Sequence, residues 1–411
     1  MKKNKAAVRV ASIVMAAALA ACVVGCSSSG TTSGSESDDS GATSTAASSL
    51  TSTDGSLITM AEYIQAYPLE GSTYAQSRMA GIYEGLYTEF VYTMGMEDVP
   101  LWCAGCHAKE SFNTFVEEYG VEALFDTEGV AGYYTASGDY EVNWGNCTNC
   151  HEGDPGDGVV TGTNSYVISD TIPSALEYVP EEDLVCGQCH TLYHSYTNEA
   201  IGLGSLDFYQ YGTGVENIMQ SLLEYIDLYG DYLIYVNDNY VLELFQGSNH
   251  QSMGLTCTDC HMVETTTEDG ETYTDHNMTA SPLENETALE FCLTCHEAQG
   301  IEDTDAMVEF VEEKIDELSV RQHVTYANLT ALGEAVTAAT DEATLDEATL
   351  EEVNELYLKA KIYYYYQHYG DYYSDLQHYD SGYSAVHNYD GSVECLDAAD
   401  ECIAEANALL S

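Results

Sequence analysis

The chain has 411 residues, of which 69 are Asp or Glu and only 10 are Lys or Arg, so its formal net charge is −59 at pH 7. A field of this sign repels nucleic acid and anionic lipid, and this excludes nucleic-acid binding as a function class. It also counts against an anionic substrate, unless the protein builds a local positive pocket.

The N-terminus has the pattern of a lipoprotein signal peptide. A basic stretch that ends at Arg9 precedes an apolar run as far as Gly25. The residues before Cys26 resemble a lipobox, in which this cysteine is lipidated and becomes the new N-terminus. Cys22 is a second candidate, but polar residues directly follow only Cys26. We expect residues 1–25 to be removed and the exported protein to be lipid-anchored at the outer face of the cell membrane; the alternative is cleavage with release.

Residues 26–58 consist mainly of Ser, Thr, Gly and Asp, with almost nothing to bury. This composition predicts a disordered tether, whose end-to-end distance is about 30 Å for roughly 30 residues. No later stretch of the sequence reaches the ~18 apolar residues that span a bilayer, so the lipid is expected to be the only attachment to the membrane.

Five Cys-x-x-Cys-His motifs occupy the middle of the chain. This is the attachment signature of c-type haem: the two thiols form thioethers with the haem, and the adjacent histidine is the proximal iron ligand. A single copy would also fit a redox dithiol or half of a zinc site, but five copies with His at the same offset argue against both. The predicted attachment cysteines are Cys103, Cys106, Cys147, Cys150, Cys186, Cys189, Cys257, Cys260, Cys292 and Cys295, and the proximal histidines are His107, His151, His190, His261 and His296. We therefore predict five haems c.

The haem motifs all fall within residues 59–300, at unequal intervals that exclude a tandem repeat. Beyond residue 300 the apolar residues from Met307 to Leu318 follow helical spacing. A second long helix is predicted from about 341 to 378, and a third from about 393 to 410. The predicted fold is mainly α: a multihaem cytochrome c with a haem-packed N-terminal region over 59–300 and long C-terminal helices over 301–411.

Two cysteines, Cys395 and Cys402, are left over in the mature chain. On one straight helix they are ~10.5 Å apart along the axis, which is too far for a disulfide. They are therefore either two buried thiols on one helix face or a disulfide across a helix break.

Seven of the twelve histidines lie outside the motifs. A haem that only passes electrons usually has two protein ligands, whereas a haem that performs chemistry keeps one position open. Counting alone cannot assign the distal positions. The candidates are His194, His250, His276, His323, His368, His378 and His387.

The order and surroundings of the motifs resemble the ammonia-forming cytochrome c nitrite reductases. The resemblance covers roughly residues 95–300 well and the C-terminal helices loosely. Its carrying segments are Cys186-Gly187-Gln188-Cys189-His190 with Tyr193, Gly214-Val215-Glu216-Asn217, Gln246-Gly247 with His250, Gly254 before Cys257-Thr258-Asp259-Cys260-His261-Met262, Tyr273-Thr274-Asp275-His276, and Ser281-Pro282-Leu283 with Asn285.

The resemblance implies distal ligands for several haems. It implies His250 for the fifth haem, His276 for the second and His387 for the fourth. The family takes a histidine upstream of the first motif for the third haem, but this chain has no histidine before its first motif. Met79 or His323 is left as a substitute there.

The departures from the family concern the active site. The first motif ends in His107, where the family usually has the Lys that coordinates the catalytic iron. The family's substrate-binding Arg and its catalytic His are absent from the matching segments, whereas its active-site Tyr is retained as Tyr193. Lys109 is the one cation near the first motif, so we take Tyr193 and Lys109 as the candidate catalytic residues. The family's calcium site loses its Glu to Leu192 and also its Lys, so calcium is kept only as a doubtful cofactor.

Two functions follow from the resemblance and these departures. One is an oxidoreductase of the ammonia-forming nitrite reductase type, which reduces nitrite, or hydroxylamine, at the first haem while the other four haems relay electrons. The other is a non-catalytic electron-transfer lipoprotein. It would pass electrons from a membrane quinol-oxidising partner to a separate reductase or an extracellular acceptor. A homodimer through the C-terminal helices is among the expected assemblies.

Overall fold

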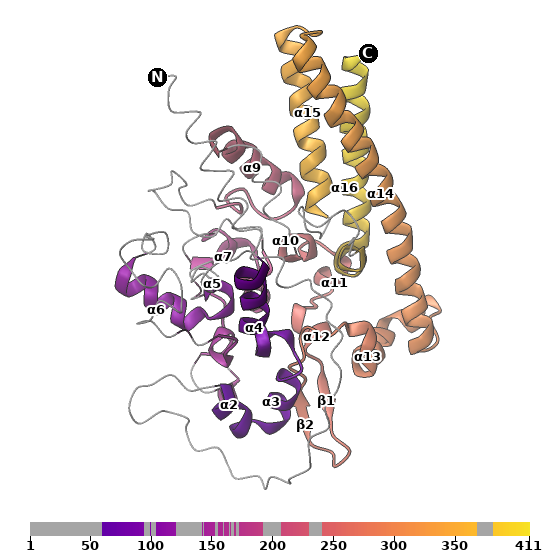
Figure 1. Ribbon diagram of the computed structural model, residues 1–411. Coiled ribbons are helices and arrows are strands. Elements are labelled where there is room, and N and C mark those ends of the chain that lie inside the picture. The colour runs from indigo at the N-terminus through magenta and orange to yellow at the C-terminus, as the bar shows by residue number, and fades with distance from the viewer. Residues whose placement is uncertain are drawn as a thin grey trace. The chain divides into compact units, whose positions relative to one another are not determined.

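The computed structural model describes residues 60–93, 99, 104–120, 142, 144–152, 155–158, 160–163, 165, 168–169, 172–191, 207–229, 241–367 and 381–411. Several predicted features lie outside these residues: the signal peptide, Cys26, the tether, Cys103, Tyr193, His194, His368 and His378. In the described part of the chain, helices dominate and one two-stranded sheet is present (Figure 1). The prediction of a mainly α fold with long C-terminal helices is confirmed.

The chain forms two compact units, which we describe separately. Among the described residues, the smaller unit comprises those within 60–161 and 264–279, and the larger unit comprises those within 162–263 and 280–411. The first two haem motifs belong to the smaller unit, and the other three belong to the larger unit with the C-terminal helices. The predicted segment boundaries stay a prediction.

The smaller unit is built from short helices and one hairpin (Figure 1). Pro68 opens α3 at a position where its missing N–H costs no hydrogen bond. Strands β1 and β2 pair antiparallel, with Thr265 opposite Tyr273. The elements are α2 (Met60–Ala66), α3 (Pro68–Tyr74), a 3-10 helix (Arg78–Gly81), α4 (Ile82–Tyr87), a π-helix (Thr88–Thr93), α5 (Ala104–His107), α6 (Lys109–Tyr119), 3-10 turns at Cys147–Asn149 and Pro155–Asp157, β1 (Glu264–Thr266) and β2 (Thr272–Thr274).

A glycine turn joins the first motif to the second. Gly145 has a φ of +60°, and a Cβ at this position would lie 2.2 Å from the carbonyl oxygen of Met79, so a larger residue would be strained and would clash. Its N–H donates to the carbonyl of His107 at 2.8 Å, and its own carbonyl accepts from the Tyr74 hydroxyl at 2.5 Å. The close approach of this backbone therefore ties the first proximal histidine to the segment that leads into the second motif.

The larger unit contains the remaining helices. Before the C-terminal helices come α7 (Ala175–Tyr178), α8 (Glu181–Gly187), α9 (Val215–Tyr229), α10 (Val241–Phe245), α11 (Asn249–Ser252), α12 (Cys257–His261), a 3-10 turn (Pro282–Glu284), α13 (Glu286–His296) and a 3-10 turn (Glu297–Gln299). Buried residues of α9 and α10 pack with Ile362 and Tyr366 of the C-terminal helices in one hydrophobic cluster. The haem-motif segments of this unit thus share a core with its long helices.

Three long helices form the C-terminal part: α14 (Thr304–Glu342), α15 (Glu347–Tyr366) and α16 (Ser381–Leu410), which lie side by side (Figure 1). Asp303 caps α14 through the N–H of Ala306, and Asp346 caps α15 through the N–H of Thr349. The helices bury a shared apolar cluster that includes Leu318, Val353 and Leu396.

The helix boundaries differ in part from the predicted ones. The chain reverses at Ala343, which has a left-handed φ of 51°, so that α15 begins at Glu347 rather than at about 341. The last helix begins at Ser381 and has a kink at Asn388, where the backbone is extended. Cys395 and Cys402 both lie beyond this kink and are free thiols, Cys395 buried and Cys402 half-buried. No disulfide joins them.

No helix in the described part of the chain combines the length and apolar character needed to cross a membrane.

The shared core of the C-terminal helices predicts a stability effect. Leu396 is fully buried in it, so Leu396→Ala should lower the free energy of unfolding by about 2–5 kcal/mol, since it removes packed methyl groups and leaves a cavity. Denaturant unfolding of the holoprotein followed by circular dichroism measures this. Val320→Ala is the control, because Val320 is 64% exposed on α14 and its replacement should change stability by less than about 0.5 kcal/mol. Equal effects of the two changes would contradict the proposed core.

Candidate haem sites

In the smaller unit, the histidine of the second motif faces a histidine that follows the hairpin. The rings of His151 and His276 have an interplanar angle of 23° and centroids 6.2 Å apart. A metal held about 2 Å from the coordinating nitrogen of each of two imidazoles separates their centroids by about 6 Å. The N–H of His276 donates to the Thr73 hydroxyl at 2.9 Å, and its Nδ1 is 2.8 Å from the carbonyl oxygen of Thr274. The spacing fits an iron between the two rings.

The fourth motif forms α12 in the larger unit. A reciprocal capping box between Thr256 and Asp259 starts this helix, so its two cysteines and its histidine come from one short, well-capped turn. The ring of His261 lies parallel to that of His387, with centroids 6.1 Å apart and an interplanar angle of 6°. The Nδ1 of His387 is 2.7 Å from the carbonyl oxygen of Tyr383, one turn earlier in α16.

The kink in α16 directly follows His387. The side-chain amide of Asn388 donates to the carbonyl of Leu244 at 2.9 Å, and its side-chain oxygen accepts from the N–H of Gly391 at 3.0 Å. Asn388 therefore ends one helical segment, begins the next and anchors both to α10. Sequence reasoning missed this residue, because neither proline nor glycine marks the break.

The fifth motif ends α13 with His296, whose ring lies 6.2 Å from that of His250. The His250 ring lies near the backbone of Val386, the residue before His387, which acts to raise its pKa while burial lowers it. This spacing is again that of two imidazoles that share a metal.

The hydrogen bonds of the distal histidines decide which nitrogen can bind iron. When Nδ1 carries the proton and donates to a backbone carbonyl, the lone pair is on Nε2. His276 and His387 each have Nδ1 within hydrogen-bond distance of a carbonyl. A partner of this kind also fixes the orientation of the ring, as it commonly does for metal-bound histidines.

Burial keeps several of these imidazoles neutral. It lowers the pKa of His190 and of His387 to about 4, and it lowers the pKa of His250. A neutral imidazole is the form that binds a metal, so these rings are ready to coordinate at pH 7. Burial also raises the pKa of Cys147 and Cys260 to about 11, so without haem both are thiols at neutral pH.

A buried carboxylate connects the third and fourth motifs. Asp183, three residues before Cys186, accepts from the N–H of Cys257 at 3.3 Å and from the Gln246 amide at 3.1 Å. It is 1% exposed, so these bonds satisfy a polar side chain that water does not reach. Sequence reasoning did not single out Asp183, since acidic residues are common throughout the chain.

The distal positions of the first and third motifs are not assigned. The segments 94–98, 121–141 and 192–206 lie outside the described residues, and the last of these contains Tyr193 and Leu192. Of the two substitutes considered for the third haem, His323 is exposed on α14 and its Nδ1 lies 2.7 Å from the carbonyl of Ser319 in the same helix. The carbonyl of Met79 packs against Gly145, beside the first two motifs.

Lys109, a predicted catalytic residue, is buried. Its side chain is 4% exposed and its ammonium donates to the carbonyl of Thr161 at 3.0 Å. Its described contacts are thus with the protein itself. The prediction that it contacts a substrate stays a prediction.

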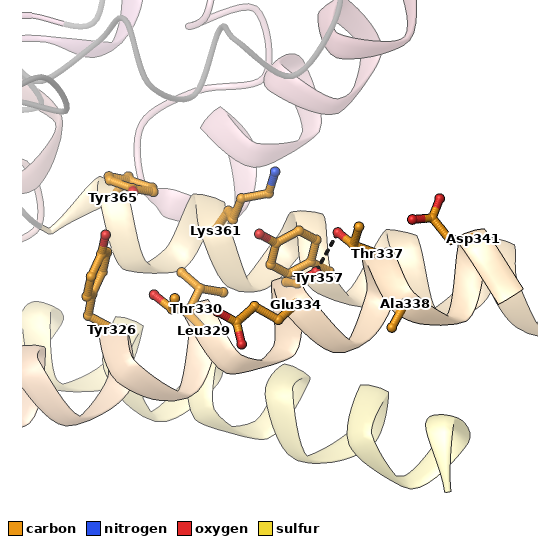
Figure 2. A pocket seen from close by; sticks show the side chains of 11 residues that line it. Tyr326, Leu329, Thr330, Glu334, Thr337, Ala338, Asp341, Tyr357, Lys361 and Tyr365 are labelled. Carbon is orange, nitrogen blue, oxygen red and sulfur yellow. Dashed lines mark hydrogen bonds between the residues drawn. The ribbon is translucent and has the colours of Figure 1, made fainter.

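A cavity of about 630 Å³ lies between α14 and α15, away from the motif residues (Figure 2). Tyr326, Tyr357, Tyr365 and Lys361 line it, and the Lys361 ammonium lies 4.5 Å from the centre of the Tyr357 ring. None of the predicted iron ligands lines this cavity, so we assign it no part in the haem sites. Among the described residues, no cluster of three or more His, Cys, Asp or Glu side chains is arranged to hold a separate metal ion such as calcium.

Comparison with known proteins identifies the family. The model of the cytochrome c552 family matches residues 83–372, which is more than half of the chain and includes all five motifs. The chain belongs to the cytochrome c552 family. It is therefore a haem c protein, and its predicted membership of the nitrite reductase family is confirmed.

The fold is similar to that of a solved structure. The cytochrome c nitrite reductase from Desulfovibrio desulfuricans, whose catalytic subunit has two calcium sites, matches with a TM-score of 0.53 and 18% identity. The match covers 76% of this chain and 65% of that protein. The outer cell wall cytochrome OcwA gives a TM-score of 0.37 at 17% identity over 80% of this chain and 49% of its own. At these identities the first likeness shows a shared multihaem cytochrome fold and no more.

The ring pairs predict distinct spectra for single histidine variants. His276, His387 and His250 are the predicted distal ligands. Replacing any one of them with Ala should convert one low-spin haem to high-spin, because one axial position of that haem opens. Electron paramagnetic resonance of the oxidised protein measures this.

His323→Ala is the matched control. His323 also hydrogen-bonds a helix carbonyl, but it is exposed, so its removal should leave the spectrum unchanged. Spectra identical to wild type in all three ligand variants would remove the assignments.

Proposed function

We propose that the protein carries five haems c, one at each motif. The second, fourth and fifth haems would each be held between two histidines, as the pairs His151 and His276, His261 and His387, and His296 and His250. The observation that carries this proposal is the ring spacing of 6.1–6.2 Å in all three pairs. Haems with both axial positions filled by protein pass electrons, whereas a haem with one open position can bind a substrate.

At the first motif we propose the six-electron reduction of nitrite to ammonium, which takes up eight protons and releases two waters. His107 would be the proximal ligand. Tyr193 would donate a hydrogen bond to the charge that develops on the substrate oxygen. Membership of the cytochrome c552 family and the shared fold with a nitrite reductase support this reaction.

A second function, electron transfer without chemistry, is favoured by a specific observation. Lys109 is the only Lys or Arg between Arg78 and Lys314, and its ammonium is hydrogen-bonded to Thr161. A nitrite anion at the first motif would therefore lack the positive neighbours that the reaction requires, and each lost donor costs about 3 kcal/mol of transition-state stabilisation. In this role the protein would pass electrons from a membrane quinol-oxidising partner to a separate reductase or an extracellular acceptor.

Both functions place the protein outside the cytoplasm, and we retain lipid anchoring through Cys26 as part of the proposal. Intact mass spectrometry of the protein purified from a membrane fraction should give a chain that begins at Cys26, with one lipid modification and five haem additions. Four or fewer haems in mature protein would contradict the haem count. A mass without lipid would contradict the anchor and leave the haem count standing.

The reaction itself is tested with an artificial donor. With reduced viologen, the protein should turn over nitrite slowly and hydroxylamine faster, because the negative protein field repels the anion but not a neutral molecule. Raising the ionic strength should raise the ratio of nitrite to hydroxylamine turnover, because salt screens that repulsion. The ratio cancels the effect of salt on the cationic donor.

Low-spin signals from every haem, together with no turnover of either substrate, would exclude the reductase and leave the electron-transfer function.

A further inference from the structure

One buried cation lies at the junction of the first two haem motifs. Lys109 follows His107 by two residues and begins α6. It is the only Lys or Arg in the stretch between Arg78 and Lys314, which contains all five motifs and many acidic residues. It is 4% exposed, whereas Arg78 in the same unit is exposed.

Lys109 contacts the second motif directly at one point and through Thr161 at another. Its backbone N–H donates to the side-chain oxygen of Asn149 at 2.8 Å, and Asn149 lies between the two cysteines of that motif. Its ammonium donates to the carbonyl of Thr161 at 3.0 Å, while the N–H of Thr161 donates to the carbonyl of Cys150 at 2.9 Å. Asn149 and Thr161 are both buried. The first residue of α6, two positions after the first motif, is thus hydrogen-bonded both to the second motif and to the segment that follows it.

The burial of an ammonium group is costly unless hydrogen bonds compensate, and an apolar residue of similar length would fill the space at lower cost. A merely structural spacer therefore does not require a lysine. A charge, however, acts on a neighbouring iron. Reduction lowers the positive charge at the iron by one unit, so a nearby cation favours the reduced state, and it does so more strongly where water is excluded.

We propose that Lys109 is a positioning residue that fixes the first two haem motifs relative to each other, and that its charge raises the reduction potentials of the haems held there. The haems of the smaller unit would then be reduced in preference to the others, and this unit contains the motif where the family performs its chemistry. The inference depends on haem attachment at these two motifs and holds whether or not nitrite is reduced.

Three substitutions in the full-length holoprotein separate the two parts of the proposal. Lys109→Arg keeps the charge, Lys109→Gln keeps a hydrogen-bond donor without the charge, and Lys109→Met removes both. A redox titration followed by visible and electron paramagnetic resonance spectroscopy resolves the successive reduction steps. The Gln and Met variants should shift one or two of the steps to lower potential and leave the others in place, and the Arg variant should shift none.

Arg78→Gln is the matched control, because it removes a positive charge from the surface of the same unit. Any shift that it causes should vanish at high salt, whereas the shift from the buried Lys109 should persist, since solvent ions do not screen a charge they cannot approach. Unchanged potentials in both neutral variants, or an equal shift of every step, would overturn the electrostatic part.

The positioning part has its own readout. The Met variant should broaden or move the low-spin signal of the haem between His151 and His276, and the Gln variant should preserve it. Identical signals in the two variants would overturn the positioning role. If the Met variant does not accumulate with haem, the reduction potentials of the Gln variant still test the effect of the charge. Loss of haem in the Met variant but not in the Gln variant supports the positioning role. Nitrite turnover is measured separately, so loss of the reductase proposal leaves this result intact.

Discussion

An iron shared by two imidazoles requires that two segments of chain, however far apart in sequence, hold their rings about 6 Å apart. Three pairs in this protein meet that requirement, and in each pair the partners come from different elements. The division of the chain into units follows from the same geometry. Residues 264–279 leave the larger unit and join the smaller one, and they bring His276 to His151. This segment contains the β1–β2 hairpin, which reverses the direction of the chain.

The C-terminal helices position two of the pairs from one turn of α16. The backbone of Val386 lies near the ring of His250, and the next residue, His387, faces His261. A shift of this turn would disturb the fourth and fifth sites together. The turn is fixed on one side by Asn388, which binds Leu244, and along its length by the apolar cluster shared by α14, α15 and α16. The long helices therefore stabilise the fold and also position the proposed iron ligands His250 and His387.

Local features such as motifs and helices can be predicted from this sequence, whereas features that depend on tertiary packing cannot. Each Cys-x-x-Cys-His motif is a contiguous signal, and the helical spacing beyond residue 300 correctly predicted long helices. The distal histidines came only from the family resemblance, because His323 and His387 make the same type of local hydrogen bond to a helix carbonyl. What distinguishes them is burial, which lowers the pKa of His387 to about 4 while His323 faces solvent. Periodicity does not report that difference.

The contacts of the Lys109 ammonium also could not be predicted from the sequence. Its place two residues after His107 suggested a cation for the substrate, since adjacency along the chain was all that could be seen. The group that accepts the hydrogen bond of its ammonium is the carbonyl of Thr161, 52 positions later, which the fold brings to it.

The charge distribution also links structure to function. The acidic surface acts on ligands through water and is weakened by salt, whereas a buried cation acts at short range and is not. In the proposed function the three pairs of histidines hold haems that carry electrons, and the net charge disfavours the approach of an anionic substrate. The chemistry at the first motif then depends on whether hydrogen-bond donors such as Tyr193 can replace the positive charge that the family uses there.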